Sequence, residues 1–88
     1  MWTWDPEKDR TNVLKHGLSL SIGAKALNDP NGLSIIDPHP TEERWRTICM
    51  IEGRVLCVVH TWFDDIDGGR IIRVRKATRQ ERDAYGTG

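Results

Sequence analysis

Two histidines and several basic residues are the side chains of this sequence that are best suited to chemistry. His16 and His60 can each transfer a proton near neutral pH. Arginine and lysine bind phosphate, and the candidates for this role are Lys15, Arg44, Arg73 and Arg75. Cleavage of RNA by its own 2′-hydroxyl needs a base, an acid and cations around the phosphate, but no nucleophile from the protein. These residue types would suit that reaction, and alone they indicate a nucleic-acid-binding domain.

The charge is unevenly distributed, although the net charge is zero. Residues 1–43 hold 4 basic and 7 acidic residues, whereas residues 44–88 hold 9 basic and 6 acidic residues. Between Arg70 and Arg82 there are six cations and a single acid. A local field of this kind can bind phosphates, and it adds Lys76 and Arg79 to the candidate RNA contacts. The alternative is an ordinary solvated strand and helix surface.

No metal or cofactor site is expected from the motifs. The histidines and the two cysteines, Cys49 and Cys57, do not follow a Cys-x-x-Cys or His-x-x-x-His spacing. The sequence also contains no glycine-rich phosphate loop and no Gly-x-Ser-x-Gly elbow. We therefore expect any catalytic chemistry to be of a kind that side chains can perform without a metal ion.

The elements that must position these residues form a small α+β domain spanning residues 1–88. Asp5-Pro6 and Gly17 mark the two ends of a first helix, and Thr78-Arg79-Gln80-Glu81 has the form of a capping box that opens a final helix. We expect two N-terminal helices on one face of a mostly antiparallel sheet of four to five strands, and a short C-terminal helix. The expected strands are 2–4, 33–37, 44–51, 54–62 and 70–76, and the expected helices are 6–16, 19 or 21 to 27, and 78 to about 85.

The strands 44–51 and 54–62 are predicted to form a hairpin that turns at Glu52-Gly53. A two-residue turn places Trp45 opposite His60. It also places Cys49 and Cys57 on opposite faces of the sheet, because successive side chains alternate. The two thiols are therefore expected to be free, as is usual in a reducing compartment.

The last strand carries the arginines of the proposed phosphate site. Strict alternation would place Ile71, Arg73 and Arg75 on one face and Ile72 and Val74 on the other. Two arginines that are two residues apart on one face would make a phosphate-binding surface.

Structural explanations compete with these chemical ones. His16 could interact with the C-terminus of the first helix, and His60 could pack against Trp45. Arg44 could be a charge on the sheet surface. The four tryptophans suit a core as well as base stacking.

Several short motifs, in order along the chain, resemble the BrnT toxins. They are Trp4-Asp5-Pro6-Glu7-Lys8, Asn12, Lys15-His16-Gly17, Asp29-Pro30, Glu43-Arg44, Ile48, the segment from Gly53 to Thr61, Arg70-Ile71-Ile72, the segment from Arg75 to Arg79, Glu81-Arg82 and Tyr85. Lys15, His16, Arg44 and Arg75 match family positions. At position 73, where the family commonly has serine, this chain has arginine.

The resemblance implies a RelE-like fold and a metal-independent endoribonuclease toxin of a type II toxin–antitoxin pair. It also implies a cognate ribbon-helix-helix antitoxin, similar to BrnA, through which the complex would bind DNA indirectly. The competing hypothesis is a degenerate toxin that binds RNA or its antitoxin without catalysis. We expect a cytoplasmic protein without a membrane partner, because no apolar run approaches the roughly 20 residues that span a bilayer and the first residues do not form a signal peptide.

Overall fold

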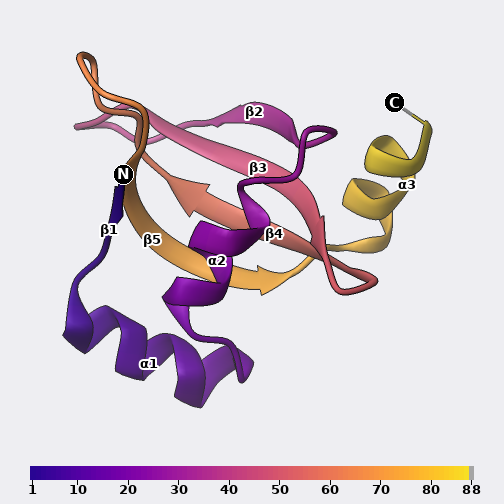
Figure 1. Ribbon diagram of the computed structural model, residues 1–88, viewed down its shortest axis with the longest axis horizontal. Helices are drawn as coiled ribbons and strands as arrows, with labels where there is room; N and C mark the ends of the chain where they lie inside the picture. The colour runs from indigo at the N-terminus through magenta and orange to yellow at the C-terminus, as the bar shows by residue number, and fades with distance from the viewer. Residues whose placement is uncertain (88) are drawn as a thin grey trace.

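A five-stranded sheet runs through the computed structural model, which describes residues 1–87 (Figure 1). The strand order is β1-β5-β4-β3-β2, in which β1 runs parallel to β5 and the other pairs are antiparallel. The strands are β1 (Trp2–Thr3), β2 (Leu33–Asp37), β3 (Arg44–Ile51), β4 (Arg54–His60) and β5 (Gly69–Lys76). The helices are α1 (Pro6–His16), α2 (Leu20–Ala26) and α3 (Arg79–Thr87). The predicted α+β class and order of elements are confirmed.

The helices divide between the two faces of the sheet. α2 packs on one face, which we call the α2 face, over a buried cluster that includes Leu56, Val58 and Val74. α3 packs on the opposite face, the α3 face, through Tyr85. The core of the α3 face consists of Ile48, Cys57, Val59 and Ala77. β1 is only two residues long and pairs with the start of β5. α1 follows it in the chain and lies along β5 at this edge of the sheet (Figure 1).

Both ends of α1 form for the reasons that the sequence suggests. The Asp5 carboxylate accepts a hydrogen bond from the Glu7 amide at 2.9 Å, and Pro6 occupies the first helical position. Gly17 ends the helix with φ +70°, a left-handed conformation that glycine adopts without strain. The predicted bounds of this helix are confirmed.

The second helix begins at Leu20 with Ser19 as its N-cap residue, but the Ser19 side chain makes no capping bond. The Asp9 carboxylate of α1 accepts the Leu20 amide instead, at 2.7 Å, and so joins the two helices. Gly23 permits close packing on the sheet, because a Cβ at this position would lie 2.6 Å from Val74 Cγ2. The glycine that weakens the isolated helix is therefore needed for its contact with the sheet.

The hairpin register is confirmed. Glu52 and Gly53 both have positive φ, which is typical of a two-residue type I′ turn. Trp45 pairs with His60, and the two buried cysteines lie in the clusters of opposite faces without a disulfide. β4 ends at His60, two residues earlier than predicted.

A bulge in β5 contradicts the predicted alternation of its side chains. His60 pairs with Ile71 and Val59 pairs with Arg73, so the register leaves Ile72 without a partner. Ile71 therefore lies with Val74 on the α2 face, rather than with the arginines. Arg73 remains on the same face as Arg75, because both pair with β4 residues of the α3 face.

Candidate functional site

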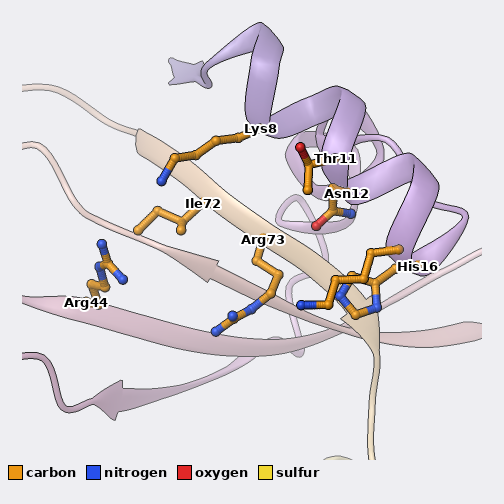
Figure 2. A pocket seen from close by; sticks show the side chains of 8 residues that line it. Lys8, Thr11, Asn12, His16, Arg44, Ile72 and Arg73 are labelled. Atoms are coloured by element: carbon orange, nitrogen blue, oxygen red, sulfur yellow. The ribbon is translucent and has the colours of Figure 1, made fainter.

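A pocket of about 340 Å³ lies between α1 and the sheet (Figure 2). We call it the α1–β5 pocket. Its size is near the lower end of the range for ligand sites, about 300–1,000 Å³. Residues from α1, β3 and β5 line it: Lys8, Thr11, Asn12, Lys15, His16, Arg44, Ile72 and Arg73. Four of the predicted site residues, Lys15, His16, Arg44 and Arg73, are thus brought together.

One face of α1 supplies most of the lining. Its five contributors occur at positions 8, 11, 12, 15 and 16, a spacing that places side chains on the same side of a helix. In Figure 2 the labelled α1 side chains lie on the side of the helix that faces β5. The pocket is therefore formed where this polar helix face meets the edge of the sheet.

Asn12 fixes α1 to the sheet. Its side-chain nitrogen donates to the carbonyl oxygens of Leu18 at 2.7 Å and Val74 at 2.8 Å, and its side-chain oxygen accepts the Val74 amide at 3.1 Å. The residue is buried, so these bonds form away from competing water. Asn12 therefore sets the distance between α1 and β5, on which the shape of the pocket depends.

His16 lines this pocket, and one of its ring nitrogens makes no hydrogen bond within residues 1–87. Its Nε2 atom is buried and has no hydrogen-bond partner among the described residues. Lys15 is exposed beside it at the end of α1, and both line the pocket. Buried polar groups are normally hydrogen-bonded, so an unpaired ring nitrogen on a residue that lines the pocket marks His16 as a candidate functional residue. The alternative role of His16, at the C-terminus of α1, is compatible with this placement.

The bulge in β5 determines what the sheet contributes. Without it, Ile72 and Arg73 would point to opposite faces, whereas here both line the pocket. Arg73 is exposed, and no acidic side chain of residues 1–87 forms an ion pair with it. Its guanidinium is free to bind an anion.

Arg44 enters the pocket from β3, oriented by Glu42. The Arg44 Nε atom donates to the Glu42 carboxylate at 2.7 Å, and Arg70 donates to the same oxygen at 2.8 Å. The bond from Arg44 holds the pKa of Glu42 below its usual value. Because only Nε of Arg44 is engaged in this contact, the rest of its guanidinium remains available for phosphate.

Arg75 lies on the same face as Arg73 but outside the pocket lining. It forms a two-bond ion pair with Glu81, at 2.8 and 3.0 Å, and Arg46 lies 3.6 Å from the same carboxylate. Arg75 holds the pKa of Glu81 at about 2, and Glu81 raises the pKa of Arg75 in return. Glu81 also accepts the Thr78 amide at 2.9 Å, which confirms the predicted capping box. Arg75 therefore anchors α3 to the sheet.

His60 is fully buried on the α2 face and does not line the pocket. It packs edge-on against Trp2 and Trp62, with ring centroids 5.1 and 4.8 Å away, and it pairs with Trp45 across the strands. Its Nδ1 donates to the Thr61 carbonyl at 2.9 Å, so its Nε2 accepts from the Thr47 hydroxyl at 2.6 Å. Burial lowers its pKa. This neutral ring is satisfied within the core.

The two other predicted phosphate contacts also lie away from the pocket. Lys76 pairs with Leu56 and so lies on the α2 face, and Arg79 begins α3. The sequence predicts no functional role for Lys8, Thr11, Asn12 or Ile72. The helical spacing of the polar residues on α1 could have indicated the first three, but the bulge that recruits Ile72 has no clear sequence signal.

Two further findings concern the described residues only. No three His, Cys, Asp or Glu side chains within residues 1–87 come together in an arrangement that could hold a metal ion. No helix among them has both the length and the apolar character required to cross a membrane.

Comparison with known protein families gives a match over most of the chain. A family model described as "Ribonuclease toxin, BrnT, of type II toxin-antitoxin system" matches residues 4–81. A comparison with curated proteins finds no match. The matched range includes every residue that lines the α1–β5 pocket. The chain therefore belongs to the BrnT family of ribonuclease toxins of type II toxin–antitoxin systems.

Proposed function

We propose that this chain, as one toxin domain with a RelE-like fold, is an endoribonuclease that cuts RNA in the α1–β5 pocket without a metal ion. The observation that carries the proposal is that His16, whose Nε2 has no partner among the described residues, lines the same pocket as Lys15, Arg44 and Arg73. A proton-transfer group among cations is what 2′-hydroxyl attack on a phosphodiester requires.

In this mechanism each residue has a defined task. His16 removes the proton of the 2′-hydroxyl, whose oxygen then attacks the adjacent phosphorus. Arg73 and Arg44 bind the phosphate oxygens and stabilise the additional negative charge of the pentavalent transition state. Lys15 donates a proton to the leaving 5′ oxygen as its bond to phosphorus breaks. The products are a 2′,3′-cyclic phosphate and a 5′-hydroxyl.

The residues outside the pocket support the site indirectly. Arg75 keeps α3 on the sheet through Glu81, and His60 stabilises the core. Lys76 and Arg79 can attract RNA only at a distance from the reacting phosphate, because they do not line the pocket. These assignments differ from the catalytic roles expected for Arg75 and His60 from sequence.

The partner in this proposal is a ribbon-helix-helix antitoxin similar to BrnA. A type II toxin is inhibited by a protein, and an acidic segment that covers Lys15, Arg44 and Arg73 would compete directly with RNA. Charge complementarity of this kind accelerates association. DNA would be bound by the antitoxin rather than by this chain, and both proteins would act in the cytoplasm.

Incubation of the purified protein with RNA in excess chelator tests the catalytic proposal. We expect cleavage with 2′,3′-cyclic phosphate ends at the same rate as without chelator. Loss of cleavage in chelator that a divalent ion restores would contradict the mechanism. Binding of RNA without any cleavage would favour the non-catalytic alternative.

Expression in a bacterial host tests the partner. We expect growth arrest when the chain is produced alone and recovery when the product of the adjacent gene is produced with it. Continued arrest in the presence of that product would contradict the proposed pairing.

A further inference from the structure

One end of the α1–β5 pocket combines an apolar surface with two cations. Ile72 is half-buried, and its inner side packs against the core of the α3 face. It also lines the pocket together with Lys8 and Arg44, and Figure 2 shows it between these two side chains. An isoleucine in this position is unusual for a site that is otherwise polar, and it is there because of the bulge between its strand and β4.

This end is separate from the end at which His16 lies. Lys8 and His16 are eight residues apart on α1, which corresponds to about 12 Å along the helix axis. In Figure 2 Arg73 lies between Ile72 and His16. The pocket therefore has a polar end at His16 and Lys15 and a second end at Lys8, Ile72 and Arg44.

We propose that Ile72, Lys8 and Arg44 form a subsite for one nucleotide next to the scissile phosphate, in which the base lies against Ile72. The proposal rests on the proposed function and deepens it by assigning a base-contacting residue. A nucleobase has an apolar face that gains free energy when it leaves water. Of the two cations beside Ile72, Arg44 is placed for the scissile phosphate on one side of that base, as in the proposed mechanism, and Lys8 for the phosphate on the other side.

The chemistry of the second end favours a nucleotide over a free anion. A site for phosphate alone would be expected to surround it with donors, whereas Ile72 offers none. Ile72 contacts the core with its inner side and leaves the rest of its side chain at the pocket. In the proposed subsite, one side of Ile72 packs against the core and the other side contacts the base.

The test measures the affinity of the full chain for three ligands by titration calorimetry. The ligands are inorganic phosphate, a nucleoside 3′-monophosphate and a nucleoside 3′,5′-bisphosphate. Wild type should bind them with increasing affinity. Ile72→Ala should weaken both nucleotides by about five- to tenfold, as expected for the loss of apolar contact with the base. It should leave the affinity for inorganic phosphate unchanged.

Two further variants separate the subsite from general effects on folding. Ile36→Ala removes a side chain of the same type from β2. Ile36 is exposed and pairs with Trp45, and both lie on the face of the sheet opposite to that of Ile72, so nucleotide affinity should not change. Lys8→Ala removes an exposed helix residue. It should reduce the advantage of the bisphosphate over the monophosphate, and it should not unfold the protein.

The outcomes are distinct from those of the cleavage experiment. Equal affinity of wild type for phosphate and for the nucleotides would overturn the subsite, as would an unchanged ratio of nucleotide to phosphate affinity in Ile72→Ala. If Ile72→Ala did not fold, an unchanged advantage of the bisphosphate in Lys8→Ala would overturn it. Nucleotide binding that depends on Ile72 in a protein that cuts no RNA would support the subsite and refute only the catalytic proposal.

Discussion

Replacing Asn12 with alanine should weaken both the fold and the pocket, because its side chain makes three hydrogen bonds that join α1 to the rest of the chain. Each such bond contributes about 1 kcal/mol net, and leaving the buried Val74 amide without a partner adds to the loss. We expect Asn12→Ala to lower the free energy of unfolding by about 2–4 kcal/mol. A domain of this size has a total of about 4–13 kcal/mol, so the expected loss is a large and measurable fraction of its stability.

Urea unfolding followed by tryptophan fluorescence measures this loss. Thr11→Ala is the matched stability control on the same helix, because the Thr11 hydroxyl is exposed and bonds only to the Glu7 carbonyl within α1, at 3.2 Å. It should change the free energy of unfolding by less than about 0.5 kcal/mol. Asn12→Asp should be at least as destabilising as alanine, since it places a carboxylate against the Leu18 and Val74 carbonyls.

The RNA-cleavage rate of Asn12→Ala should fall as well, because α1 carries Lys15 and His16 and would no longer be held at its position on β5. If Asn12→Ala were as stable as Thr11→Ala, the side-chain bonds would not hold α1 to the sheet. Another contact would then have to position α1 and the pocket on β5.

Three further predictions concern the residues outside the pocket. Burial lowers the pKa of His60 from 6.5, so the buried ring resists protonation that the unfolded chain accepts. The free energy of unfolding should therefore fall as the pH drops below 6.5, by up to about 1.4 kcal/mol per pH unit. His60→Gln should abolish this slope when unfolding is measured as a function of pH. Glu81→Gln should lower the free energy of unfolding by about 2–4 kcal/mol at pH 7. The difference from wild type should shrink as the pH falls from 4.5 toward 2, where wild-type Glu81 gains its proton. A difference that stayed constant over this range would show that the charge of Glu81 does not contribute to stability. Burial raises the pKa of Cys49 and Cys57 to about 12, so neither thiol should react with a thiol reagent until the protein unfolds, and rapid modification of the native protein would contradict their placement.

The elements of the fold could be predicted because local signals mark their ends. Asp5-Pro6 and Gly17 define α1, and the Thr78–Glu81 capping box defines the start of α3. Glu52-Gly53 is a signal for a tight turn, in which both residues have positive φ. The hairpin register followed from that turn alone. These features depend on residues that are close in the sequence, where propensity and side-chain capping act.

The candidate site was predicted only in part, because it depends on contacts between distant segments. The bulge beside Ile72 arises from the pairing of β4 with β5 and reverses the expected face of Ile71. The engagement of Arg75 by Glu81 depends on where α3 packs, and the burial of His60 depends on Trp2 and Trp62. The residue types alone could not distinguish these arginine and histidine side chains from those in the pocket.

The most direct test of the proposed site compares RNA cleavage by two histidine variants in excess chelator. His16→Gln removes the imidazole of a histidine that lines the pocket, whereas His39→Gln changes an exposed histidine that lies outside it. We predict that His16→Gln reduces the cleavage rate by about 100-fold or more, the usual effect of losing a proton-transfer group, and that His39→Gln cleaves at the wild-type rate. A folded His16→Gln protein that cleaves RNA as fast as wild type would contradict the assignment of the α1–β5 pocket as the catalytic site.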